Sequence, residues 1–439
     1  MRGTPRSVHF GDNVSGQYGP RWSILTGRNG SYKSTIFREI VQGLILWDGI
    51  EGNPLKLIRR EGGDDSPPRV LAVSGTVADR FPLKHQNIKT TVFDQPNYVY
   101  FGQRVNANII SKREIIEHVA FYMLDSKVED RLSTPFHIRI YELLGLRRFV
   151  ELRVESAKSP NENRRSNQPP LFETLSNVAN YRSQIGAGAI QYSAETARFL
   201  LDEFSRATFD ELHKFLHGTR RKVHAVISGS IETQGLGADA IRLGLYVEKL
   251  RITSVTVESL DSEKGFSAFD LSSGEYHLWS TLLAICFSVQ NGDVVLIDEP
   301  ETSLHPQWQI EYMRLLNDIT AFMTNGHIVV STHSPLMISA ARPGASVIDV
   351  SEQQSSSSKI AVNFAGSADD ILVNRFGLKS SRNHDFVDKL QRAIHLVELG
   401  DDNGEEFEVL SHTLSSYRAL LPDTDPITDI IDALIKTEQ

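Results

Sequence analysis

The sequence predicts an α/β fold, in which helices cover a mainly parallel sheet and a mostly helical insertion divides that domain. Two apolar runs, VVLID at 294–298 and HIVVS at 327–331, lack the alternation of half-exposed strands and are typical of parallel strands buried on both faces. Between residues 111 and about 217 the apolar residues instead recur at spacings of three and four, which indicates helices. An apolar strand, a Gly-rich turn and a helix at 22–35 complete the α/β pattern.

The composition is that of a globular protein with more than one core. A chain of 439 residues is long enough for two or three domains. No run approaches the roughly 20 apolar residues that span a bilayer, and the first ten residues lack the apolar segment of a signal peptide. The single cysteine, Cys286, lies in an apolar stretch. We therefore expect a cytoplasmic protein that does not contact a membrane.

The charge is unevenly distributed along the chain. The formal net charge is −9, and residues 366–439 hold 15 Asp and Glu against 7 Lys and Arg, so most of the excess is local. This balance argues against a generally basic surface for nucleic acid, although the nearly neutral remainder leaves room for a local basic groove. Binding of DNA or RNA stays open.

The segment WSILTGRNGSYKST, residues 22–35, has the pattern of a phosphate-binding loop. Backbone N–H groups of such a turn, and of the helix that follows, point at one spot and attract an anion. Lys33 would reach the β- and γ-phosphates of ATP, and the Ser34 hydroxyl would ligate Mg²⁺. The predicted nucleotide-binding residues are Gly27, Arg28, Asn29, Gly30, Ser31, Tyr32, Lys33, Ser34 and Thr35.

Tyr32 departs from the pattern G-x-x-x-x-G-K-[ST], which has glycine at this position. We expect the tyrosine to adopt the helical backbone conformation there, with its side chain crowding the phosphates. ATP binding would then survive while hydrolysis slows.

Four segments follow along the chain. Residues 1–110 and 218–350 are the two parts of the α/β domain, residues 111–217 are the helical insertion, and residues 351–439 are an acidic, helical C-terminal region. Within the insertion we expect one helical pattern through IYELLGLRRFVELRV, at 140–154. In the second part we expect strands at VHAVISG, 223–229, and across IRLGLYVEKLRITSVTVES, 241–259, where apolar and polar residues alternate.

Asp298 and Glu299 come directly after the buried strand VVLID. At the end of that strand Asp298 can hold Mg²⁺, through a water molecule or Ser34. Glu299, next to it, is placed to orient or deprotonate the water that attacks the γ-phosphate. A fortuitous charged turn is the alternative, but the phosphate loop and the PETSLHP segment that follows argue against it.

The segment LSSGE, 271–275, leads into a predicted helix, so Ser272 and nearby N–H groups would form an anion site at the helix start. An ordinary helix N-cap is the simpler interpretation, and both can hold. In this order the motifs resemble the ABC-type P-loop ATPases of the SMC/RecF/OLD kind (AAA_21), whose heads carry DEPE-x-x-LHP, as residues 298–306 do here.

The resemblance implies further roles. Ser272 and Gly274 would face the γ-phosphate bound by a second protomer, so that the active unit is a head-to-tail dimer or a higher oligomer. His333 would be the switch histidine that contacts the γ-phosphate, and Ser303–His305 would lie at the dimer interface. Gln103 matches the glutamine that links Mg²⁺ and water to the inserted lobe, with Gln95 as the competitor.

Among these ATPases the chain is most similar to the ATPase subunits of bacterial anti-phage systems, of the Septu (PtuA-like) or retron-associated type. This similarity implies a separate effector protein, such as an HNH nuclease. The acidic clusters at 369–370, 401–402 and 405–406 follow no strand pattern, so we expect solvated turns and no nuclease in this chain. Two alternatives remain: a RecF/SMC-like ATPase that clamps DNA, and a nucleotide-binding scaffold that hardly hydrolyses ATP.

Overall fold

The computed structural model divides the chain into two compact units, residues 1–364 and 365–439. The structure describes residue 10 and residues 19–27, 32–45, 68–83, 96–104, 110–157, 170–180, 192–219, 222–262, 264–350, 359–360, 384–400, 404–418, 421 and 426–436.

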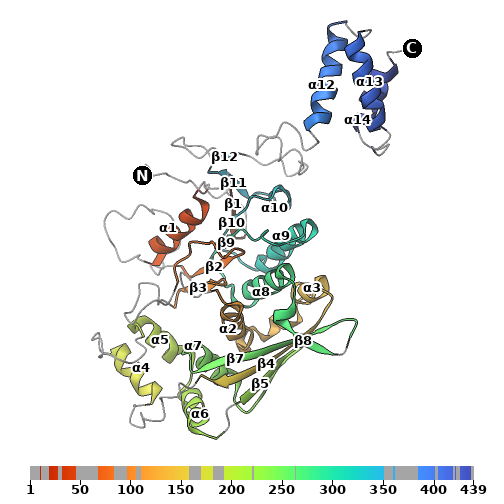
Figure 1. Ribbon diagram of the computed structural model, residues 1–439. Coiled ribbons are helices and arrows are strands. Elements are labelled where there is room, and N and C mark those ends of the chain that lie inside the picture. Colours follow the sequence, from red (N-terminus) through yellow and green to blue (C-terminus); the bar gives the residue numbers. More distant parts are fainter. Residues whose placement is uncertain are drawn as a thin grey trace. The chain divides into compact units, whose positions relative to one another are not determined.

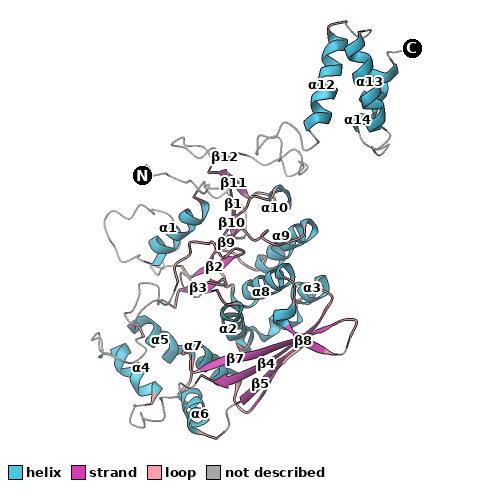
Figure 2. Ribbon diagram, viewed as in Figure 1, coloured by secondary structure: helices cyan, strands magenta, loops and turns pink. Residues whose placement is uncertain are grey.

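The first unit is built on a seven-stranded sheet whose inner strands are all parallel, as the apolar runs predict (Figure 2). Only the pairing of the short edge strand β12 with β11 is antiparallel. The strand order is β12 (Lys359–Ile360), β11 (Ser346–Asp349), β1 (Arg21–Thr26), β10 (His327–Ser331), β9 (Val294–Asp298), β2 (Val70–Ser74) and β3 (Tyr98–Phe101). Segments from both ends of the unit therefore meet in one sheet.

Helices cover both faces of this sheet (Figure 1). On one face α1 (Lys33–Ile45) buries Phe37 and Val41 against strand residues such as Leu25 and Leu296. The other face is covered by α8 (Ser273–Ser288), α9 (Pro306–Thr320) and α10 (Pro335–Ser339). Helix α8 is buried from Tyr276 to Ser288, because it is apolar all round and lies inside the unit.

A second, antiparallel sheet of five strands belongs to the same unit. Its order is β6 (Ile231–Gln234), β5 (Lys222–Ile227), β4 (Leu146–Ser156), β7 (Leu250–Ser259) and β8 (Gly265–Ser267). The central strand β4 corrects the helix expected through 140–154. Gly145, at φ +63°, ends α3 (Pro135–Leu143), and Val150, Leu152 and Val154 then alternate toward one buried face.

The strand expected across 241–259 is also wrong in its first half, which is the helix α7 (Ala238–Tyr246). Residues Ala240–Leu245 of this helix are all buried, so the alternation of apolar and polar residues in this segment does not mark a strand with one exposed face. The other helical elements of this lobe are α2 (Lys112–Met123), η1 (Ser126–Ser133), α4 (Leu171–Asn180), α5 (Ala194–Glu203), α6 (Arg206–His217) and η3 (Ala268–Asp270).

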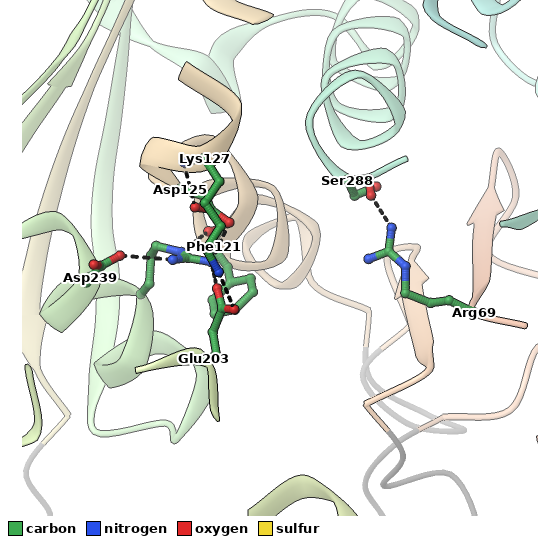
Figure 3. A network of polar contacts seen from close by, with 8 residues as sticks. Arg69, Phe121, Asp125, Lys127, Glu203, Asp239 and Ser288 are labelled. Carbon is green, nitrogen blue, oxygen red and sulfur yellow. Dashed lines mark hydrogen bonds and ion pairs between the residues drawn. The ribbon is translucent and has the colours of Figure 1, made fainter. Parts of the chain in front are cut away.

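The buried Arg242 of α7 links the helices beside the five-stranded sheet. Its guanidinium pairs with Asp125 at 2.8 Å, Glu203 at 2.7 Å and Asp239 at 2.9 Å, and it donates to the carbonyl oxygen of Phe121 at 3.0 Å. Figure 3 shows these partners converging from different elements. Because all three guanidinium nitrogens donate to oxygen atoms, the buried cation is compensated and fixes how α2, α5 and α7 pack.

A second guanidinium anchors the end of α8 (Figure 3). Arg69, directly before β2, donates to the carbonyl oxygen of Ser288 and pairs with Asp293 at 2.8 Å. Asp293 directly precedes β9, so this contact holds the last turn of α8 against the ends of two adjacent strands.

The second unit consists of α12 (His384–Glu398), α13 (Glu405–Arg418) and α14 (Pro426–Lys436) around a core of their own. The core residues are Phe386, Leu390, Ala393, Leu396, Phe407, Leu414, Ile431 and Leu434. Glu406 is exposed and pairs with Arg392 at 2.7 Å. The acidic pairs at 369–370 and 401–402 lie outside the described residues. No described helix, here or in the first unit, is long and apolar enough to cross a membrane.

Candidate functional site

The predicted ATP site lies at the carboxyl ends of the parallel strands. The register places Leu25, Ser331, Asp298 and Ser74 in one row across β1, β10, β9 and β2. Loops that leave this row carry the candidate residues, and such strand ends are where open α/β sheets bind their ligands.

Lys33 opens α1 and is 5% exposed. Its Nζ donates to the carbonyl oxygen of Gly27 at 3.4 Å and contacts Nε2 of His333. Burial lowers the pKa of Lys33, and the carboxylates of Glu299 and Asp298 oppose that effect. The start of α1 therefore places the Lys33 ammonium among acidic side chains. A bound phosphate would replace His333 as the partner of this ammonium.

Asp298, the last residue of β9, is fully buried. Its Oδ1 accepts a hydrogen bond from the Ser331 hydroxyl, whereas Oδ2 has no hydrogen-bond partner among the described residues. Burial raises the pKa of Asp298 to about 6, and hydrogen bonds from Ser331 and Ser34 oppose that rise. An unpaired, buried carboxylate oxygen beside a serine hydroxyl fits Mg²⁺, which prefers oxygen ligands.

Glu299 and His333 face each other across the ends of β9 and β10. Oε1 of Glu299 lies 3.6 Å from Nε2 of His333. The contact with His333 lowers the pKa of Glu299, and Lys33 adds to this effect. A carboxylate held in its ionised form beside the Asp298 site can accept a proton from water.

The backbone of Glu299 is unusual. Its φ is +49°, in the left-handed region, and its N–H donates to the carbonyl oxygen of Ser331 at 3.0 Å. Gly75, after β2, lies so close that an added Cβ would be 2.2 Å from the Glu299 carbonyl oxygen. Only glycine fits there, because the backbones of these two turns approach each other closely.

Tyr32 does not adopt the helical conformation that we expected. Its φ is +69°, and its carbonyl oxygen accepts the first hydrogen bond of α1, from Ile36 N–H at 2.9 Å. The side chain is 59% exposed. The glycine of the loop pattern thus serves a turn that needs positive φ, which costs a tyrosine about 1–2 kcal/mol. Arg28, Asn29, Gly30 and Ser31 lie outside the described residues.

Restoring the glycine should accelerate hydrolysis. Tyr32→Gly relieves the left-handed strain and removes a ring from the loop, so we expect turnover to rise by up to about tenfold, the rate equivalent of roughly 1.4 kcal/mol, with ATP affinity unchanged. Phosphate release and calorimetry measure the two quantities. Tyr32→Ala, which removes the ring but keeps the strain, separates the two causes. Equal rates in all three proteins would show that the tyrosine has no catalytic effect.

Ser272 and Gly274 lie at the start of α8. Ser272 is exposed and caps the helix: its hydroxyl accepts from Glu275 N–H at 3.3 Å, and Glu275 Oε2 accepts from Ser272 N–H at 2.8 Å. Gly274 is buried, and an added Cβ would lie 2.4 Å from the carbonyl oxygen of Ser303. The structure therefore brings Gly274 against Ser303 of the 303–305 turn.

Gln103 follows β3 and is partly buried, and its carbonyl oxygen accepts from Ser111 N–H at 2.7 Å. One strand, β2, lies between β3 and the strand β9 that ends at Asp298. Gln95, the competing choice, lies outside the described residues. No group of three or more His, Cys, Asp or Glu side chains suited to a metal ion occurs in the part of the chain that the structure describes.

Three contributors to the site were missed in the sequence. Ser331 bonds Asp298, Gly75 contacts Glu299, and Glu301 accepts from the backbone N–H of His333 at 2.6 Å. Each lies at or just after a strand end. For Glu301 and Ser331 the available signal was their position in VVLIDEPE and HIVVSTHSP, because residues next to a site residue at a strand end lie close to it in space.

The chain is similar to a solved structure and to a protein family. The crystal structure of the SmcHead bound to the C-winged helix domain of ScpA is similar over 79% of this chain and 92% of that one, at 12% identity and a TM-score of 0.30. No curated protein matches the chain. The family described as "AAA domain, putative AbiEii toxin, Type IV TA system" matches residues 23–339, from β1 to the end of α10. This match covers most of the chain and every described site residue, so the chain belongs to the AAA_21 family of nucleotide-binding ATPases.

Proposed function

We propose that this chain binds Mg-ATP at Lys33, Ser34 and Asp298 and hydrolyses it with Glu299 as the base. The observation that carries the proposal is the meeting of a buried ammonium, an unpaired carboxylate oxygen and an ionised carboxylate at one edge of the sheet. Bound Mg²⁺ would neutralise phosphate charge, held by Asp298 and Ser34, with Gln103 as a further candidate ligand.

In this mechanism Lys33 exchanges its His333 contact for the β- and γ-phosphates. The His333 imidazole is then released beside Glu299, where it can contact the γ-phosphate. Glu299 accepts a proton from the attacking water. Its lowered pKa favours the basic form at neutral pH, which is the form that this step requires.

The proposal includes a head-to-tail dimer. Ser272 and Ser273 are exposed at the N-terminus of α8, where N–H groups of the first turn and the helix dipole favour an anion. A phosphate bound by the second protomer suits that position, and symmetric pairing would give two composite sites. The carboxylate of Glu275 now bonds the Ser272 N–H and would have to make way for the phosphate.

Mixing two defective variants tests action across the dimer. Ser272→Arg places a bulky cation at the start of α8, and Lys33→Ala removes the phosphate contact. In a mixed dimer one composite site carries both defects and the other carries neither, so we expect partial recovery of ATPase activity. The measurement is phosphate release from equimolar mixtures, with each variant alone as control. An absence of recovery in proven mixed dimers would argue against the composite site.

The resemblance to anti-phage ATPases supports a narrower role, in which the dimer regulates a separate effector such as an HNH nuclease. The DNA-clamping alternative is less favoured, because two of the cations on the five-stranded sheet are paired with acids: Arg153 with Glu151 and Lys222 with Glu155. The left-handed Tyr32 favours the scaffold alternative, with slow turnover. Isolation of the native complex, with and without ATP, and identification of the co-purifying protein would decide among them.

A further inference from the structure

Glu301 lies in the turn between Glu299 and Leu304, which joins β9 to the segment before α9. Its Oε1 accepts a hydrogen bond from the backbone N–H of His333 at 2.6 Å, and its side chain also interacts with Thr332. Glu301, two residues after the predicted base Glu299, thus contacts the main chain of the predicted switch histidine, His333. A carboxylate accepting from an N–H group is a charge-assisted bond, which is shorter and stronger than a neutral one.

A second contact holds Ser334, the residue that follows His333. Nε2 of Gln309 donates to the carbonyl oxygen of Leu304 at 3.0 Å, and Oε1 of Gln309 accepts from the Ser334 hydroxyl at 2.5 Å. Ser334 in turn caps α10. His333 is therefore held from one side by Glu301 and through its neighbour by Gln309, and both groups belong to the chain between β9 and the first turns of α9.

The opposite side of the same turn contacts the start of α8. The carbonyl oxygen of Ser303 lies where a Cβ on Gly274 would be, and Ser303 itself has φ +66°. Nε2 of His277, on α8, lies 3.0 Å from the carbonyl oxygen of Pro300, so a hydrogen bond joins the helix to the turn. The turn is thus packed between the helix end that carries Ser272 and the loop that carries His333.

We propose that Glu301 is a positioning residue for His333, and that it transmits the position of the 299–304 turn to the imidazole. This inference rests on the proposed function, since His333 has a role only if the site hydrolyses ATP. Glu301 touches neither nucleotide nor water in this scheme. It fixes the His333 main chain, and hence the imidazole, beside Glu299 and Lys33.

The test compares Glu301→Ala with Glu301→Gln, which keeps an oxygen acceptor at the same place. We expect Glu301→Ala to lower kcat by about tenfold to a hundredfold, as misplaced supporting groups do, with KM and the calorimetric Kd for ATP unchanged. Glu301→Gln should restore most of the rate. Hydrogen exchange at the His333 amide should speed up in the alanine variant and stay near the wild-type rate in the glutamine variant. Glu39→Ala, an exposed acid on α1, is the matched control.

A double-mutant cycle separates positioning from a general loss of structure. If Glu301 acts through His333, Glu301→Ala should have no further effect on kcat in a His333→Ala background. Equal fold-losses in the two backgrounds, or a raised Kd with unchanged kcat, would overturn this inference and leave the proposed function intact. A wild-type chain without ATPase activity would overturn both.

Discussion

Replacing Lys33 with alanine should abolish measurable ATP binding in isothermal titration calorimetry. The ammonium is buried beside the carboxylates of Asp298 and Glu299, so its removal leaves a negative site that repels the phosphates. Loss of one partner from a buried charge pair typically costs about 2–5 kcal/mol, which weakens binding by at least roughly thirtyfold.

The control for this experiment lies one turn further along the same helix. Arg38 is exposed and pairs only with its neighbour Glu39 in the described contacts, so Arg38→Ala removes the same charge from α1 without touching the site. ATP affinity should be that of the wild type in this variant. Undiminished affinity in Lys33→Ala would contradict the assignment of the phosphate site.

Glu299→Gln should keep ATP binding and remove turnover. The amide has nearly the shape of the carboxylate, but it cannot take a proton from water, and loss of a general base costs about 10² to 10⁴ in rate. The φ of +49° at this position is the same burden for both side chains, so the fold of the turn should persist. Phosphate release measures the loss, and size-exclusion chromatography with ATP should show an accumulated dimer.

Glu39→Gln makes the same chemical change at an exposed position of α1 and should leave both rate and affinity as they are. Wild-type hydrolysis by the Glu299→Gln protein would show that a different group activates the water. It would favour Glu301 or a water held by Mg²⁺ as the next candidate, and the mechanism proposed above would be wrong.

The central strands could be predicted from the sequence because burial on both faces leaves an unbroken apolar run, as in VVLID and HIVVS. The part of the unit around the five-stranded sheet could not be predicted in this way, because its helices and strands have similar patterns of apolar and polar residues. Residues 140–150 have helical spacing, and only Gly145, whose left-handed φ ends α3, marks the change to β4. In α7 the buried Arg242 pairs with Asp125 and Glu203, which are distant in the sequence, and such tertiary contacts leave no local pattern.

The same distinction applies to the site. Lys33, Asp298 and His333 follow strands or open a helix, so the topology alone brings them together, as the sequence predicts. The helical conformation that we expected for Tyr32 was wrong, because this residue directly precedes α1 and has a φ of +69°, a turn that the sequence does not reveal. Glu301 was missed because its partner is a backbone N–H, which any residue at 333 would supply, so no pairing of side-chain types reveals it.

The sheet order has a consequence for the synthesis of the chain. β1 is flanked by β10 and β11, and β2 contacts β9, so two of the earliest strands bond partners more than 200 residues later. At about 5–20 residues per second, the ribosome needs roughly 15 s to a minute to deliver those partners. Until then Ile24 and Leu71 have no neighbours on at least one edge, and the nucleotide pocket cannot close around ATP. A nascent chain stalled before residue 294 would expose open strand edges to chaperones, and nucleotide could assist folding only after His333 has emerged.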